Sequence, residues 1–265
     1  MESTTPFIGT DVTSRECPIE STVFQLVAGA GIGAVITHLH GQCSEALQIS
    51  LKEGNEVRIA ESYLFAADLD AWSSAIDGQL EVSLLQTAAS EYVLAILNVC
   101  QGQYRNGFKG LRLVLELCLQ CTHLSANLVL RAEWLRGEKD TIWATLVDPE
   151  NGPLSSRSCR AFFPDLSEHV GHFRQMAQTL YRELSECIHG NVPNHIPLPT
   201  SLAFSQETFD LWQSKARLVR LVVHFAFALT YLNSLPATKR SLLEAAVKDQ
   251  LGHIAAIRGA FEEGD

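Results

Sequence analysis

Apolar residues recur every three or four positions along most of this sequence, and this spacing constrains the fold more than any other feature. A helix turns once every ~3.6 residues, so the spacing gathers the apolar side chains on one face. No useful stretch alternates apolar and polar residues as a half-buried strand does. The sequence therefore predicts an all-α helical bundle, with helices over residues 56–76, 80–101, 104–136, 166–189, 205–234 and 237–260.

Turn-forming residues divide these helices. The pair Asp77–Gly78 interrupts the apolar pattern, and residues 148–164 collect Pro, Gly, Asn and Ser, which are typical of a loop. We expect residues 1–80 to form a lead-in and a helical extension, and residues 81–265 to form the main bundle. A chain of 265 residues fits one large domain or two small ones.

Composition limits the class of protein. The net charge of −10 argues against a general nucleic-acid coat protein, although a few local cations suffice for an RNA-cleaving enzyme. The start of the chain lacks the basic residues and apolar core of a signal peptide, so we expect a cytoplasmic protein. The seven cysteines follow no regular spacing, and buried free thiols explain them most simply. Residues 24–39 are apolar but shorter than the ~20 residues of a membrane span, which favours a buried helix over a membrane role.

The segment RELSECIH, from Arg182 to His189, is the candidate site. Arg182, Ser185 and His189 are spaced i, i+3 and i+7, which places them on one helix face. A histidine can take or give a proton near neutral pH, and an arginine can hold a phosphate. This combination suits metal-independent RNA cleavage through the 2′-hydroxyl. The alternative is structural: Arg182 pairs with a carboxylate such as Glu186, and His189 complements the helix dipole.

The two candidate groups are far apart within one chain. Arg182 and His189 lie about 10 Å apart along a helix axis, from its rise per residue. Two copies that meet across a symmetry axis would close this gap, so the cleavage hypothesis predicts a homodimer.

Two segments resemble the HEPN superfamily. Arg182 and His189, with six residues between them, are similar to its R-x4–6-H motif, and LYRELSECIHG is similar to a branch with a Y-x-x-L-S-x-x-x-H-G signature. Residues 100–116, with Gly102, Tyr104 and Gly107, look like the first long helix of such domains. The resemblance covers roughly residues 85–232.

The resemblance implies a fold, a site and a function. HEPN domains are helical bundles, often dimeric, found in toxin–antitoxin systems, phage (antiviral) defence and RNA processing. It implies Arg182 and His189 as catalytic residues, Ser185 and Asn191 as supports, and Arg112 and Glu116 as braces from the facing helix. Many HEPN-like domains bind or scaffold without cutting. A non-catalytic interaction module, acting as accessory subunit of a defence or signalling complex, is therefore the alternative to a ribonuclease held in check by an antitoxin or other partner.

Other motifs point to no cofactor and no metal. Residues 29–33, GAGIG, lack the strand and the third glycine of a dinucleotide-binding loop, and close helix packing explains them better. The CxxC pair Cys118 and Cys121 has no second pair, so a structural zinc is not expected. Lys215, Arg217 and Arg220 give one helix a cationic edge, which is either an RNA track or a solvated face.

Overall fold

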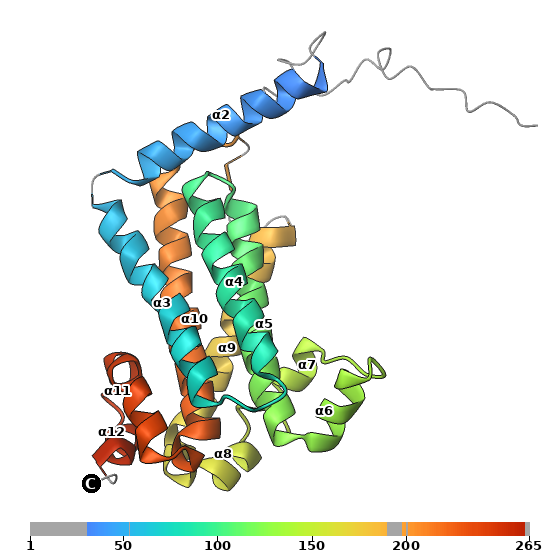
Figure 1. Cartoon of the computed structure of the whole chain (residues 1–265), viewed down its shortest axis with the longest axis vertical. Helices are drawn as coiled ribbons and strands as arrows, with labels where there is room; N and C mark the ends of the chain where they lie inside the picture. The colour runs from blue at the N-terminus through green and yellow to red at the C-terminus, as the bar shows by residue number, and fades with distance from the viewer. Residues whose placement is uncertain (1–30, 53, 190–197, 200, 263–265) are drawn as a thin grey trace, which may run out of the picture. The chain divides into compact units, whose positions relative to one another are not determined.

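The computed structural model describes residues 31–52, 54–189, 198–199 and 201–262 (Figure 1). The chain divides into two units, residues 1–41 and 42–265. The described part of the first unit is the beginning of α2 (Ile32–Ser50), a helix that continues into the second unit. Across these ranges the secondary structure is helical and no residue lies in a β-strand, which confirms the all-α prediction.

Five long helices build the second unit. They are α3 (Asn55–Ala75), α4 (Val82–Cys100), α5 (Tyr104–Ala126), α9 (Ser167–His189) and α10 (Gln206–Tyr231). Short helices connect and extend them: α6 (Leu128–Leu135), α7 (Trp143–Leu146), α8 (Ser156–Phe162), α11 (Ala237–Leu251) and α12 (Ala255–Glu262), with 3-10 turns η2 (Pro164–Leu166) and η3 (Leu232–Ser234). In Figure 1, α3, α4, α5 and α10 run side by side along the bundle.

The core of this unit is continuous and aromatic. Trp72, Trp212, Phe108 and Phe225 are fully buried among leucine and valine side chains. Burial of each large apolar side chain contributes roughly 1.5–3 kcal/mol, so the core supplies the main driving force for folding.

Helices α4 and α5 approach closely because glycines face small residues. A Cβ atom at Gly107 would lie 2.3 Å from the side chain of Val99, and one at Gly110 would lie 2.8 Å from the Cβ of Ala95. The turn between the two helices uses Gly102 with a φ of 74°, a conformation that other residues rarely adopt. These glycines set the position of α5, which carries one side of the candidate site.

Helices α3 and α10 run parallel and in register. Most of their polar contacts join residues that are 151 or 152 positions apart, from Asn55–Gln206 at the start of α3 to Trp72–His224 near its end, and two join residues 156 apart, about one helical turn further along α10. Such a nearly constant separation requires that both helices run in the same direction. The polar side chains thus fix the register of two helices that are distant in sequence.

The division of the chain differs from the expected boundary near residue 80. Helix α3 packs against α4, α10 and α11, and its residues Phe65, Leu69 and Trp72 belong to the core. The structure therefore places α3 in the bundle, with the division at residues 41/42.

Two expected helices are interrupted. The expected helix 104–136 is bent by 120° between α5 and α6, at Asn127. The expected helix 237–260 breaks between α11 and α12 at Gly252 and His253. In addition, the expected loop 148–164 contains the short helix α8, whose first turn is capped by the Ser155 hydroxyl.

Candidate functional site at the end of helix α9

The last turns of α9 lie against α5. Leu180 and Leu184 are buried and Ile188 is half-buried, so the apolar stripe of this helix faces the bundle as its spacing predicts. Arg182 and His189 are exposed. Packing of the apolar stripe therefore presents the predicted site to solvent.

His189 meets Arg112 from the facing helix. The Nη1 atom of Arg112 lies 3.3 Å from Nε2 of His189. A guanidinium can only donate hydrogen bonds, so this contact requires Nε2 to accept. The arrangement therefore favours a neutral imidazole that carries its proton on Nδ1.

Arg112 is held in place by two further partners. Its Nε donates to Glu116 at 3.0 Å, and its Nη2 donates to the Tyr181 hydroxyl at 2.5 Å. The guanidinium carbon also lies 4.4 Å from the centre of the Tyr181 ring, within the range of a cation–π contact. Of the two braces implied by the resemblance, Arg112 contacts His189 directly and Glu116 contacts Arg112.

Tyr181 completes the support. Its ring stacks on Trp143 with centroids 3.8 Å apart and an angle of 6° between the planes. Burial and the nearby Glu116 carboxylate raise the pKa of the Tyr181 hydroxyl, so it stays protonated at neutral pH. Neither aromatic residue was among the predicted site residues. Trp143 lies in α7, outside both matched segments, and Tyr181 was noted only as part of the matched signature.

A stripe of three cations on α5 lies beside the end of α9. Arg105, Lys109 and Arg112 are spaced by four and three residues and share one face of α5. Arg105 donates to the Ile188 carbonyl and, at 3.3 Å, to the Cys187 carbonyl, in the last turn of α9. This stripe could have been found from the sequence by its helical spacing.

A surface cavity of about 200 Å³ lies beside this stripe. Lys109, Arg112, Glu116, Leu113 and Ile188 line it. Within the described part of the chain, the Lys109 amine is engaged by no carboxylate. The cavity thus offers two cations and an apolar wall next to the histidine.

Arg182 is separate from this cluster. Its side chain is 71% exposed, and its Nε lies 3.9 Å from Glu186, a pairing that sequence analysis named as the structural alternative. The Ser185 hydroxyl donates to the Tyr181 carbonyl at 2.7 Å and is therefore engaged by its own helix. Asn191 lies outside the described residues. The structure thus joins His189 to Arg112, whereas Arg182 remains about two turns away.

Glu183 does not face Arg182 as a free carboxylate. Its Oε2 accepts from Lys215 of α10 at 2.8 Å. This ion pair neutralises the acidic residue that follows Arg182 in the sequence. The repulsion that Glu183 would exert on a bound phosphate is correspondingly weaker.

The cationic edge of α10 is engaged by carboxylates. Besides Lys215, Arg217 lies 3.6 Å from Glu61 and Arg220 contacts Asp68 at 2.7 Å. Lys215 turns to α9, whereas Arg217 and Arg220 turn to α3, so the three side chains do not form one continuous RNA track. Of the three, Arg217 remains 67% exposed.

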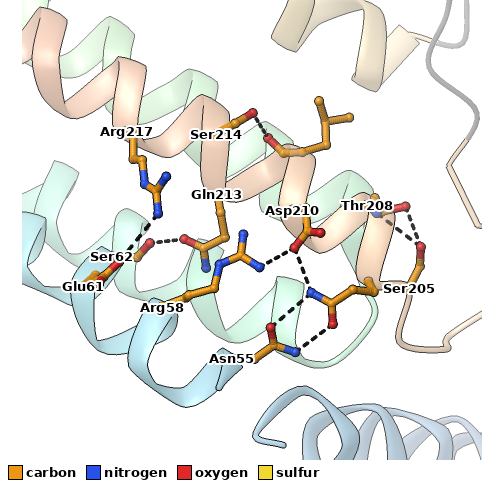
Figure 2. Close-up of polar contacts among 12 residues, drawn as sticks. Asn55, Arg58, Glu61, Ser62, Ser205, Thr208, Asp210, Gln213, Ser214 and Arg217 are labelled. Atoms are coloured by element: carbon orange, nitrogen blue, oxygen red, sulfur yellow. Dashed lines mark hydrogen bonds and ion pairs between the residues drawn. The ribbon is translucent and has the colours of Figure 1, made fainter. Parts of the chain in front are cut away.

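Figure 2 shows the polar contacts between α3 and the first turns of α10. Asn55 exchanges two amide hydrogen bonds with Gln206, at 2.9 and 3.1 Å. Arg58 pairs with Asp210, and Ser62 donates to Gln213. Asn55, Arg58 and Ser62 continue, toward the start of α3, the three- and four-residue spacing of its buried residues Phe65, Leu69 and Trp72. Such positions are usually apolar, so the polar contacts were not predicted from the sequence.

Deeper in the same seam lies a largely buried polar cluster. Asp68 accepts from Arg220 at 2.7 Å and lies 3.0 Å from Nε2 of the fully buried His224. Trp72 donates to Nδ1 of His224 at 3.3 Å. Since Nδ1 accepts from the indole, Nε2 donates to Asp68. The cluster satisfies each buried group, and its role in this geometry is to hold α3 on α10.

The cysteine pair in α5 is chemically quiet. Cys118 and Cys121 are fully buried, and burial raises the pKa of the Cys121 thiol to about 12. Across the described ranges no group of three or more His, Cys, Asp or Glu side chains is placed to hold a metal ion. The described cysteines are free thiols.

One described helix, α4, is long and apolar enough to cross a membrane, and the bent pair α5 and α6 passes the same test together. In α4, 44% of the residues of this apolar stretch are buried in the bundle. Residues 31–39 of the apolar segment 24–39 are described, and from Ile32 onward they lie in α2. Ile32 is 75% exposed and Ile36 is 58% exposed, so this part of the segment is not the buried helix that the sequence predicts.

Comparison with known protein families, curated proteins and solved structures finds no match to this chain.

Proposed function

We propose that the chain is a HEPN-like, metal-independent endoribonuclease with its reactive centre at His189. The observation that carries the proposal is the contact between His189 and Arg112, which pairs an accepting imidazole with a cation at an exposed helix end. Lys109 and Arg105 add positive charge to this surface in an otherwise acidic protein. Phosphate groups bind where such cations gather.

The chemistry follows from the positions of these groups. A phosphate of RNA would attract Arg112 away from Nε2 of His189, which frees the lone pair of the imidazole. His189 then takes the proton of the 2′-hydroxyl, and the 2′-oxygen forms a bond to phosphorus. The bond from phosphorus to the 5′-oxygen breaks, and that oxygen takes a proton from water. The products are a 2′,3′-cyclic phosphate and a 5′-hydroxyl.

Arg182 has a second role in this proposal. Its pairing with Glu186 is loose and exposed, so the side chain is able to reach a phosphate on the same helix face. In a homodimer, the Arg182 of one protomer would lie near the His189 of the other. A role as a toxin or phage-defence effector, controlled by a protein partner, belongs to the same proposal.

The test is cleavage of end-labelled RNA in the presence of EDTA. The His189→Ala variant should lose roughly 10²–10⁴-fold in rate, the contribution of a general base. Its matched control is His253→Ala, because His253 is also exposed but lies at the break between α11 and α12. Equal cleavage by wild type and His189→Ala would refute the proposal.

Arg182 has an equally close control. Arg217 is 67% exposed and lies 3.6 Å from Glu61, much as Arg182 is 71% exposed and 3.9 Å from Glu186. Arg182→Ala should slow cleavage by roughly 10²–10³-fold, as expected for loss of a cation at the phosphate, and Arg217→Ala should not.

The second candidate function is a non-catalytic helical interaction module. The separation of Arg182 from His189 within one chain favours it, because the two residues of the R-x6-H pattern do not meet. RNA that is bound but left intact by the wild-type protein would select this function.

A further inference from the structure

Helices α3 and α4 enclose a surface groove of about 620 Å³. Small residues form much of its lining: Ala66, Ala67, Ala89 and Ser90. Larger side chains stand beside them, and of these Tyr63 is 54% exposed and Leu94 is 50% exposed. The groove lies on the outer side of the two helices, since their inner side chains Phe65 and Tyr92 are buried in the core.

The exposed apolar residues around the groove follow helical spacing. On α4 they are Val93, Leu94 and Leu97, and on α3 the exposed Tyr63 lines the groove. On α4 the outward positions 90, 93, 94 and 97 are separated by three and four residues, which makes one continuous face. An apolar face of this kind on a soluble bundle marks an interaction surface more often than a chance distribution.

The charged residue in the lining of the groove itself is a carboxylate, Asp70. Helix α4 contains no Lys, Arg or His, and the one cation of α3, Arg58, is paired with Asp210 of α10. Asp70 lines the groove, and the neighbouring cavity toward α5 is lined by Glu91 and by Lys109 of α5. Over the described ranges, neither carboxylate takes part in an ion pair.

We propose that this groove binds an amphipathic helix of another protein, whose apolar stripe is flanked by Lys or Arg. An apolar stripe with spacing i, i+3, i+4 and i+7 fits a groove between two helices. The flanking cations would meet Asp70 and Glu91, which gives the site its selectivity. The inference is independent of the proposed ribonuclease activity.

Charge argues against other occupants. A second copy of the chain would bring the same acidic residues against one another. Residues 1–30 carry four acids (Glu2, Asp11, Glu16, Glu20) and one cation, Arg15, so they do not complement the groove. An anionic membrane surface would be repelled for the same reason.

The test uses the full chain and three fluorescent 18-residue helical peptides of defined sequence. The first has a leucine stripe flanked by lysines, the second replaces the lysines by glutamates, and the third has the composition of the first with the leucine spacing scrambled. We expect the first peptide to bind at least tenfold more tightly than the other two. Equal binding of the scrambled peptide would overturn the proposal, because charge alone would then explain the affinity.

Variants locate the binding site. Leu94→Asp should weaken the first peptide at least tenfold, whereas Leu242→Asp on α11, at a leucine of similar exposure (59%), should not. Ser90→Trp should also weaken it, because Ser90 is exposed and its replacement fills the groove without a change in the core. Asp70→Lys combined with Glu91→Lys should reverse the preference toward the glutamate peptide.

Two further results would replace the proposed occupant. Sedimentation that shows a dimer of the wild type, dissolved by Leu94→Asp and not by Leu242→Asp, would assign the groove to a second copy. Binding to phosphatidylcholine vesicles that is lost in Leu94→Asp would assign it to lipid. Circular dichroism confirms that each variant is folded, and failure of both Leu94→Asp and Ser90→Trp to weaken binding would overturn the proposal.

Discussion

Replacement of Asp68 by alanine tests how the buried seam holds α3 on α10. Asp68 is the shared acceptor of Arg220 and His224, at 2.7 and 3.0 Å. Alanine leaves both donors without this partner in a place that water reaches poorly. Removal of one member of a buried ion pair typically costs about 3–5 kcal/mol.

The structure places this variant at the lower end of that range. The Arg220 side chain is 15% exposed and also lies 3.6 Å from Asp249, so it keeps a second, solvated partner. We therefore expect Asp68→Ala to lower the free energy of unfolding by ~3 kcal/mol. For a domain of this size the corresponding decrease in Tm is roughly 6–12 °C.

Urea unfolding followed by circular dichroism measures the change, and Asp210→Ala provides the control. Asp210 lies in the same seam and pairs with Arg58, but its side chain is 48% exposed. An exposed pair contributes about 0–1 kcal/mol, so the control should unfold almost as the wild type does. Equal losses in the two variants would refute the reasoning, because burial would then not determine the strength of these contacts.

Four further predictions concern packing, capping, thiol reactivity and the dependence of stability on pH. Gly107→Ala should destabilise the protein by about 1–3 kcal/mol, because the added Cβ would lie 2.3 Å from the side chain of Val99. Gly171→Ala in α9 should instead stabilise the protein by ~0.5–1 kcal/mol, because a Cβ there meets nothing within 4 Å. Urea unfolding of the two variants checks the contrast. Ser205→Ala should cost about 1 kcal/mol in the same assay, since the Ser205 hydroxyl accepts from the Thr208 amide at the start of α10, and a loss below the error of the measurement would contradict the capping role. Burial raises the pKa of the Cys187 thiol to about 11 and that of the Cys121 thiol to about 12. Iodoacetamide at pH 8.5 should therefore modify the half-buried Cys43 well before it modifies Cys187 or Cys121. Mass spectrometry of the peptides measures the order of modification. Because these thiols ionise at a lower pH in the unfolded chain, near ~8.5, their contribution to stability is complete below that pH and is lost as pH rises toward 11 and 12; a stability that stays constant across this range would contradict the burial of the thiols.

The long helices could be predicted because their apolar spacing is local information. The expected helix 166–189 differs from α9 by one residue at its start, and the buried stripe of Leu180 and Leu184 is as predicted. Breaks inside apolar patterns were harder to predict, since α6 continues the leucine-rich composition of α5 beyond the bend at Asn127. A bend of this kind depends on which partner each segment packs against.

The candidate site was predictable on α9 but only in part on α5. Arg112 and Glu116 followed from a resemblance, and their contacts with Tyr181 and His189 could not be derived from spacing within one helix. The buried cluster of Asp68 and His224 escaped prediction because its members are 156 positions apart. Charged residues on an apolar pattern resemble a solvated face until the facing helix is known.

The most direct test of the central claim is analysis of the RNA ends produced in EDTA. If His189 removes the proton of the 2′-hydroxyl, wild-type protein yields 2′,3′-cyclic phosphate and 5′-hydroxyl ends from RNA. The same protein leaves an otherwise identical oligonucleotide with a 2′-deoxy residue at the cleaved position intact, and His189→Ala yields neither end. Cleavage of the deoxy substrate, or products with a 5′-phosphate, would contradict the account.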